Sequence, residues 1–213
     1  MSIARWLCFT ALLLICNTTS AQLQTYTNSA DFDAAVGLVV VEDFESSPLG
    51  ELNAGANDVG MFDVFLDAAD TDGTSRVADF GLVNGSRELQ LDLDNDHNTV
   101  IRFDFDQPIF GFGADFGAAL TGDFLTLEVN GNLFALNDFL ATSGDGFFGI
   151  SSEQSFESIT FGRESATSFG KFFAVDNVRL SAVPEPGSGL VAIVFGVIAA
   201  SRRSRNRQCC SKV

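Results

Sequence analysis

Acidic side chains are the main candidates for chemistry in this chain of 213 residues, which has 28 Asp and Glu but one histidine. Calcium is the metal that such a composition favours, because it binds about six to eight carboxylate and carbonyl oxygens. Three groups of acids offer such oxygens: Asp92, Asp94 and Asp96; Asp70 and Asp72 before Gly73; and Asp43 or Glu45 with Asp176. No other cofactor is indicated.

Each group also has a purely structural interpretation. Asp92 and Asp94 alternate with leucines, which is typical of the solvent face of a strand. Asp176 and Asn177 fit a β-bulge, where their side chains would bind backbone groups. We predict the calcium site at Asp43, Glu45 and Asp176, because a jelly roll often brings its first and last strands together.

Catalysis by a nucleophile has little support. His97 lies in a predicted turn, no Gly-x-Ser-x-Gly motif occurs, and all four cysteines lie outside residues 22–182. A Ser-His-Asp arrangement would have to use His97. A zinc site is equally disfavoured, because residues 22–182 contain one His and no Cys. Paired carboxylates of a glycoside hydrolase remain open, although nothing in the sequence distinguishes a pair.

Sugar binding is a further alternative, and it depends on exposed rings. Sugar-binding platforms favour Trp or Tyr, but Tyr26 is the one such residue between positions 22 and 182. Phe147 and Phe148 offer a substitute if they are exposed, or they belong to the core.

Short strands must position these side chains, because apolar and polar residues alternate with a period of two. The expected strands cover residues 38–44, 61–66, 89–93, 101–106, 110–116, 125–129, 147–150, 156–161 and 171–180. We expect the strand at 38–44 to be covered on both faces, and the last strand to change phase at Asp176 and Asn177. Asn130 and Gly131 predict a type I′ hairpin.

Few other elements are expected. A short helix covers residues 29–36 with Ser29 as its N-cap, and loops cover residues 46–60 and 67–75. The fold class is therefore all-β, an antiparallel β-sandwich of jelly-roll type over residues 22–182. Twenty of the 22 Phe lie in this part and are expected to form its core.

The N-terminal residues 1–21 have the pattern of a secretory signal peptide. Arg5 precedes an apolar stretch, and small residues end it. Cleavage by signal peptidase is expected between Ala21 and Gln22.

The C-terminal residues form three consecutive parts. Val183, Pro184, Glu185 and Pro186 interrupt any helix or strand, and an uncharged apolar run of residues 189–200 follows. This run is shorter than the roughly 20 residues that span a bilayer. An arginine cluster then starts with Arg202 and Arg203. Such a cluster favours a cytoplasmic location for the segment that follows the apolar run.

This tail, residues 183–207, resembles the PEP-CTERM sorting signal of exported bacterial proteins. The resemblance implies a short transmembrane helix that holds the chain in the inner membrane of a Gram-negative-type bacterium until an exosortase-like protease cuts near Pro184–Pro186. It also implies delivery to the cell surface or the extracellular matrix. The tail departs from the family by an extension at residues 208–213, which includes Cys209 and Cys210.

The strand pattern is also similar to the ectodomains of PEP-CTERM proteins, in the segments 110–116, 147–151 and 175–178. A second resemblance, to lectin-like and MAM-like jelly rolls, rests on Asp43-Phe44-Glu45 and on Asp176-Asn177-Val178. Both imply a fold rather than an activity.

Charge limits the partners of the processed protein. Removal of the leader and of the residues after Pro186 leaves six Lys and Arg against 28 acids, a net charge of −22. Nucleic acids and anionic membranes are therefore excluded as partners of the domain, apart from the membrane contact of the tail before processing. We expect a non-enzymatic structural or adhesive protein, with extracellular polysaccharide as a partner; a carbohydrate-binding module and a secreted hydrolase are the alternatives.

Overall fold

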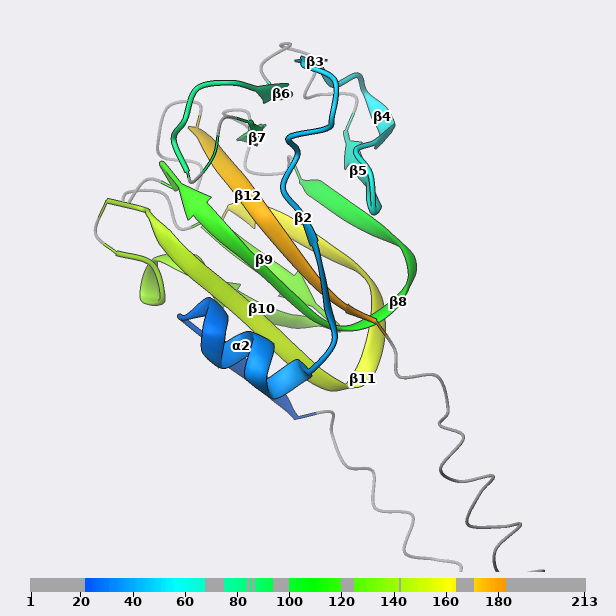
Figure 1. Cartoon of the computed structure of the whole chain (residues 1–213), viewed down its shortest axis with the longest axis vertical. Coiled ribbons are helices and arrows are strands. Elements are labelled where there is room, and N and C mark those ends of the chain that lie inside the picture. The colour runs from blue at the N-terminus through cyan, green and yellow to red at the C-terminus, as the bar shows by residue number, and fades with distance from the viewer. Residues whose placement is uncertain are drawn as a thin grey trace, which may run out of the picture. The chain divides into compact units, whose positions relative to one another are not determined.

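In the part of this chain that its computed structural model describes, twelve strands pair antiparallel (Figure 1). The structure describes residues 22–67, 75–83, 85, 87–93, 100–119, 125–141, 143–163 and 171–182. The predicted all-β, antiparallel fold class is therefore confirmed. The leader at residues 1–21 and the tail, Val183–Val213, lie outside the described residues, so the predictions for them remain predictions.

The elements follow one another along the chain with two short helices among the strands. The strands are β1 Leu23–Tyr26, β2 Val39–Glu42, β3 Gly50–Glu51, β4 Gly55–Asp58, β5 Phe62–Leu66, β6 Arg76–Ala78, β7 Glu88–Leu93, β8 Ile101–Gly117, β9 Leu125–Val129, β10 Asn132–Ala135, β11 Gly146–Arg163 and β12 Lys171–Ala182; the helices are α2 Ser29–Val36 and the 3-10 turn η2 Leu136–Asp138.

Two long strands belong to both layers of a sandwich-like sheet. The first part of β8 pairs with β5 and with the second part of β11, whereas its second part pairs with β12 and with the first part of β11. One layer is therefore β1-β11-β8-β12, extended by β2 and by β7-β6-β3. The other layer is β10-β9-β11-β8-β5-β4.

The change of layer occurs at irregular positions of both strands. The register between β11 and β8 shifts on either side of Phe156, and Pro108 lies at the same corner of β8. A proline has no N–H to donate, so it is tolerated where regular pairing is interrupted. Strands that switch sheets commonly do so at such bends. Figure 1 shows β8 and β11 curving together at this corner.

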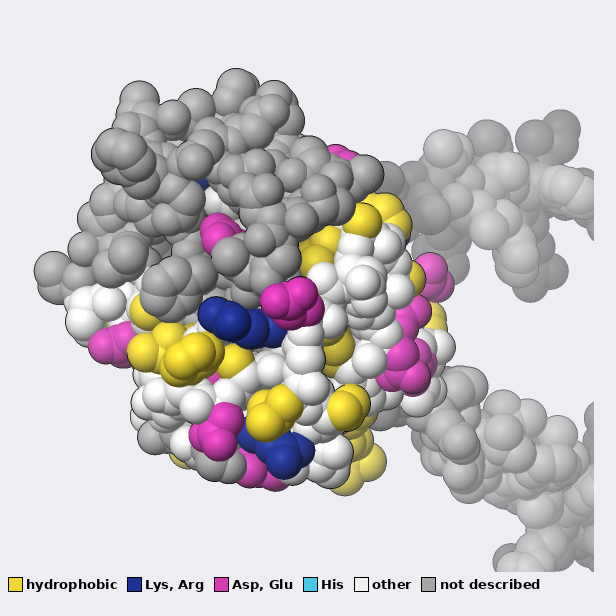
Figure 2. Space-filling view, turned by 90° about the horizontal axis from the view of Figure 1, so that it is seen from above, with side chains coloured by type: hydrophobic (Ala, Val, Ile, Leu, Met, Phe, Trp, Pro, Cys, Tyr) yellow, Lys and Arg dark blue, Asp and Glu magenta, His cyan; other side chains and the backbone are white. Residues whose placement is uncertain are grey.

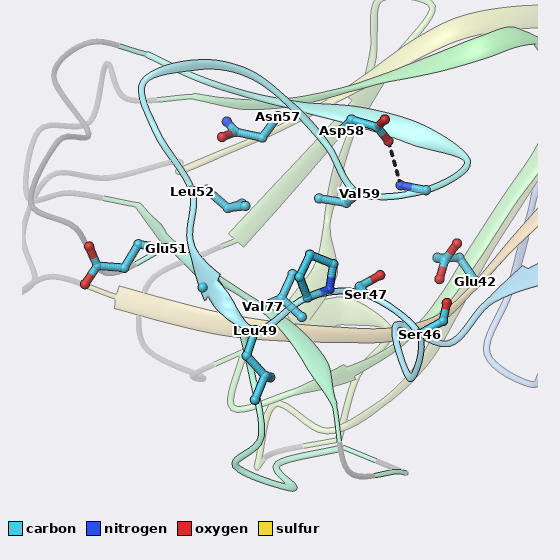
Figure 3. A pocket seen from close by; sticks show the side chains of 13 residues that line it. Glu42, Ser46, Ser47, Leu49, Glu51, Leu52, Asn57, Asp58, Val59 and Val77 are labelled. Carbon is cyan, nitrogen blue, oxygen red and sulfur yellow. Dashed lines mark hydrogen bonds between the residues drawn. The ribbon is translucent and has the colours of Figure 1, made fainter.

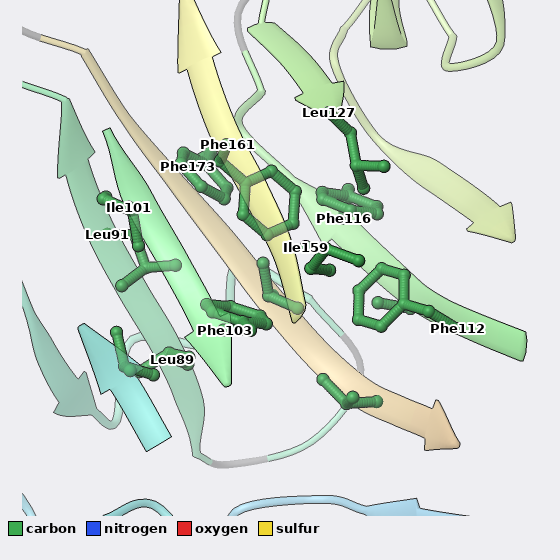
Figure 4. Packing of buried hydrophobic residues seen from close by; sticks show 14 of the residues in the cluster. Leu89, Leu91, Ile101, Phe103, Phe112, Phe116, Leu127, Ile159, Phe161 and Phe173 are labelled. Atoms are coloured by element: carbon green, nitrogen blue, oxygen red, sulfur yellow. The ribbon is translucent and has the colours of Figure 1, made fainter. Parts of the chain in front are cut away.

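Phenylalanine rings fill the space between the layers (Figure 4). The ring of Phe161 lies 5.0 Å from that of Phe103 and 5.2 Å from that of Phe173, centroid to centroid, and Phe103 lies 4.7 Å from Phe62. These four side chains come from four strands and are at most 2% exposed. The predicted Phe core is confirmed for them.

A second, small cluster lies under α2 on the outer face of one layer. Phe32 of α2 is fully buried between Tyr26 and Phe147, with ring centroids 5.6 and 5.8 Å away. The sheet beneath carries Gly111, Gly113 and Gly149, and the absence of a Cβ at these positions lets the rings approach the backbone.

Several local predictions were wrong in detail. The N-cap of α2 is Asn28 rather than Ser29, because the Asn28 carboxamide oxygen accepts hydrogen bonds from the backbone N–H groups of Ala30 and Asp31. The expected loop 46–60 contains β3 and β4, which pair with β6 and β5. The strands expected at 101–106 and 110–116 are the single strand β8, and those at 147–150 and 156–161 are the single strand β11.

The strand predicted at 38–44 is β2, but it is not covered on both faces. It pairs with β12 alone among the described strands, and Val40 and Val41 are 48% and 47% exposed. Its run of valines reflects an edge strand rather than a buried central one. The type I′ hairpin is confirmed, since Asn130 and Gly131 have φ values of 49° and 74°.

Within the described residues, no helix is both long and apolar enough to cross a bilayer. The predicted membrane helix lies outside these residues.

The close contact between α2 and the sheet is testable by Gly149→Ala. A Cβ at Gly149 would lie 2.9 Å from Phe32 and 3.0 Å from Phe147, so two buried rings would have to move. We expect the free energy of unfolding to fall by about 1–3 kcal/mol in chemical denaturation, as is usual for overpacking. Gly50→Ala is the matched control, because a Cβ there has no atom within 4 Å. Equal stability of the two variants would contradict this packing.

Candidate functional site

A β-bulge in β12 places Asp176 in the interior. The register of β12 against β8 shifts between Asp176 and Arg179, and Asn177 has a φ of 48°, a left-handed conformation that Asn tolerates. Val175 and Val178 are both buried as a result, and Asp176 is 1% exposed. The change of phase predicted from the sequence is therefore confirmed as a bulge.

The Asp176 carboxylate lies among other acids. Its Oδ1 accepts a hydrogen bond from the backbone N–H of Asn177 at 2.6 Å. Asp115, its partner on β8, accepts from the Asn177 carboxamide at 3.0 Å, and an Arg179 guanidinium nitrogen lies 3.8 Å from Asp115. The buried Glu88 accepts from two backbone N–H groups of residues 82–83.

Glu45 approaches Asp176 beside Gly85. A Cβ at Gly85 would lie 2.9 Å from Glu45 Oε1 and 3.2 Å from Asp176 Oδ2, so both carboxylates are directed toward this backbone position. Two of the three residues predicted to bind calcium are thus brought together. Asp43, the third, is exposed, and its Oδ1 accepts a hydrogen bond from the Glu45 backbone N–H.

Burial raises the pKa of Asp176 to about 7. The hydrogen bond from the Asn177 N–H lowers the pKa, whereas the negative charges of Asp115, Glu45 and Glu88 raise it further. A carboxyl group that stays protonated near neutral pH donates rather than accepts at one oxygen. That oxygen of Asp176 therefore changes from a hydrogen-bond donor to an acceptor within the physiological pH range.

The other predicted calcium groups are only partly described. Asp92 is half-buried in β7, and its backbone N–H donates to Ser75 Oγ, while Asp70, Asp72, Asp94, Asp96 and His97 lie outside the described residues. Within the described ranges, no group of three or more His, Cys, Asp or Glu side chains is placed to hold a metal ion.

The ring pair considered for sugar binding is buried. Phe147 is 8% exposed and packs on Phe32, and Phe148 is fully buried and lies 4.9 Å from the ring of Phe139. The two rings point to opposite faces of β11, as successive residues of a strand must. Neither offers a flat exposed surface.

A cavity of about 560 Å³ lies where β2, β3 and β4 meet. In Figure 2, which shows the molecule from above, acidic, apolar and Lys or Arg side chains lie near one another on the described surface. In Figure 3, Glu42 lies at one end of the cavity and Glu51 at the other, with Leu52, Val59 and Val77 between them. The cavity thus combines an apolar floor with carboxylates at its rim.

Glu42 is held firmly at this rim. Its Oε1 accepts a hydrogen bond from the Phe44 backbone N–H at 3.1 Å, and a Cβ at Gly60 would collide with its Oε2. Burial raises the pKa of Glu42, the Phe44 hydrogen bond lowers it, and the charge of Asp43 raises it. Sequence reasoning missed this residue, although a single Glu that ends a run of three valines was a usable signal.

The titration of Asp176 predicts how stability depends on pH. Between about pH 4 and pH 7 the folded state keeps the Asp176 proton while the unfolded state has lost it, so the free energy of unfolding falls as pH rises, by up to roughly 1.4 kcal/mol per unit. Above the pKa that Asp176 has in the folded state, its contribution to the free energy of unfolding is completely lost. We expect Asp176→Asn to remove this slope in urea denaturation at pH 5 to 8. Glu128→Gln, an exposed site on β9, is the control and should keep it; identical slopes in all three proteins would refute the assignment.

Comparison with known proteins gives no closer guide to this site. Neither the models of known protein families nor the curated proteins contain a match to this chain.

Proposed function

We propose that the chain is an exported, non-enzymatic β-sandwich protein of jelly-roll type with a structural or adhesive role in exopolysaccharide or biofilm. Signal peptidase would remove the leader, and an exosortase-like protease would release the chain from the inner membrane to the cell surface or matrix. The tail carries this proposal, because a Pro-Glu-Pro motif, an apolar run and an arginine cluster follow one another from Val183.

The described strands lie between the two expected cleavage places. β1 begins at Leu23, directly after the expected cleavage between Ala21 and Gln22, and β12 ends at Ala182, directly before Val183. Both strands pair with long strands of the sheet, β1 with β11 and β12 with β8. Cleavage at the two expected places therefore removes none of the described strands.

The pairing of β12 with β2 supports the jelly-roll type. Residues 178–181 of the last strand pair with residues 39–42 of an early strand, and the two lie in the same layer. A jelly roll often brings early and late strands of the chain together in this way.

The sorting step predicts the C-terminus of the released protein. In a bacterium that has an exosortase, we expect mass spectrometry of protein from the medium to find chains that end near Pro184–Pro186 and lack Arg202. A chain with Pro184→Ala and Pro186→Ala should keep its tail and stay with the cells, whereas Ser188→Ala should be processed normally. Secreted protein that still contains residues 202–207 would contradict the proposal.

A structural calcium ion at Asp43, Glu45 and Asp176 is part of the proposal. Glu45 and Asp176 converge beside Gly85, which supports it. At calcium concentrations about 100 times its Kd, we expect the melting temperature in calorimetry to rise by roughly 5–10 °C. Chelator should reverse the rise and Asp176→Asn should abolish it, while Glu128→Gln should not. An unchanged melting temperature would remove calcium from the proposal.

A further inference from the structure

A second cavity continues the one at β3 and β4. It has a volume of about 250 Å³ and is lined by Val40 of β2, Phe105 and Ile109 of β8, and Leu180 of β12. Gly60 lines both cavities, and Val40 and Glu42 occupy alternate positions of β2, so they share one face of that strand. The two cavities therefore adjoin at Gly60 along β2, and we refer to them together as the β2 groove.

The β2 groove carries one sign of charge. Four carboxylates line it, from Glu42, Glu51, Asp58 and Asp106, and none of the residues that line the two cavities is Lys, Arg or His. Its floor is apolar at both ends, with Phe105 and Ile109 in the smaller cavity. A ligand that fits must be cationic over the larger cavity and apolar over the smaller one.

The strand beside the groove is open to further pairing. Among the described strands β2 pairs with β12 alone, so no described strand pairs with the opposite edge of residues 39–42. Leu38, Val40 and Val41 are 77%, 48% and 47% exposed. Natural edge strands are commonly protected by Lys, Pro or a bulge, and residues 38–41 have none of these.

We propose that the β2 groove binds an extended, basic segment of a partner protein, which adds to the edge of β2 as a further strand. Strand addition takes affinity from main-chain hydrogen bonds and specificity from alternate side chains. An apolar side chain of the segment lies over Phe105 and Ile109, and Lys or Arg side chains two and four residues along meet Glu42 and then Asp58 or Glu51. The charge complementarity of these carboxylates identifies the segment as cationic.

The salt dependence of binding follows from the same residues. The carboxylates that face the groove are Glu42 from β2, Glu51 from β3, Asp58 from β4 and Asp106 from β8. Salt should weaken binding, because the rim carboxylates are open to solvent.

The test is fluorescence anisotropy with short labelled peptides and the protein as recovered from producing cells. One probe is the capped peptide Thr-Val-Thr-Lys-Thr-Lys-Thr, and a second has the same residues in reverse order. Because three of the four carboxylates line the larger cavity, whereas Phe105 and Ile109 line the smaller one, we expect one order to bind more tightly. The same peptides with Glu in place of Lys should not bind.

Protein variants locate the site. Glu42→Gln combined with Glu51→Gln should weaken binding of the better probe by about tenfold or more, since each change removes one partner of a charge pair. Glu128→Gln with Asp138→Asn removes two exposed charges elsewhere and should change affinity by less than about twofold. Val40→Lys keeps Glu42 and its hydrogen bond but places a positive charge in the groove. This charge repels the Lys side chains of the probe, so the variant should also abolish binding.

Three results would overturn the proposal. The first is that neither probe binds, and the second is an equal loss of affinity in the groove double variant and the control double variant, which would indicate long-range attraction only. The third is a concentration-dependent dimer in sedimentation that Val40→Lys dissociates, which would show that a second copy of the chain covers the groove. Thermal melts of each variant establish that it is folded.

Discussion

The fold depends on one constraint, which is that β8 and β11 must leave one layer and enter the other together. Their paired bend at Pro108 and Phe156 joins the two layers by continuous hydrogen-bonded strands. The bend brings rings from different layers into contact, such as Phe103 from the first part of β8 and Phe112 from its second part, 6.3 Å apart. Burial of these rings is the main favourable contribution to the free energy of folding, because a phenylalanine side chain can be buried without a hydrogen-bond partner.

The same construction creates the two places where chemistry is concentrated. Where β12 crosses from β7 to β2, the bulge at Asn177 turns Asp176 inward to meet Asp115 and Glu45. Between β2, β3 and β4 lies the groove that contains Glu42, and its lining continues at Ser46 and Ser47, directly after Glu45 in the chain. One site is a buried acid with a raised pKa, and the other is an open acidic surface beside an edge of β2 with which no described strand pairs.

Much of this was predictable from local pattern. Alternation of apolar residues located most strands, Asn130 and Gly131 specified their turn, and the phase change at Asp176 specified the bulge, since each depends on a few neighbouring residues. The merging of two predicted strands into β8 was not predictable. A proline such as Pro108 normally indicates the end of a strand, and only the tertiary structure shows that β8 bends there and continues. The exposure of Val40 was not predicted either, because a run of valines is equally typical of a buried strand and of an edge strand.

Composition and order along the chain thus determined that the protein is all-β, acidic and filled with phenylalanine, and they carry the expectations for its two ends. Tertiary structure decided which acids meet. Glu45 and Asp176 are 131 positions apart, and Glu42 and Asp58 approach one groove from different strands, because strand order in space is not strand order in sequence. The physical reason is that a period of two assigns each side chain to a face of its strand, but only the pairing of strands assigns that face a neighbour.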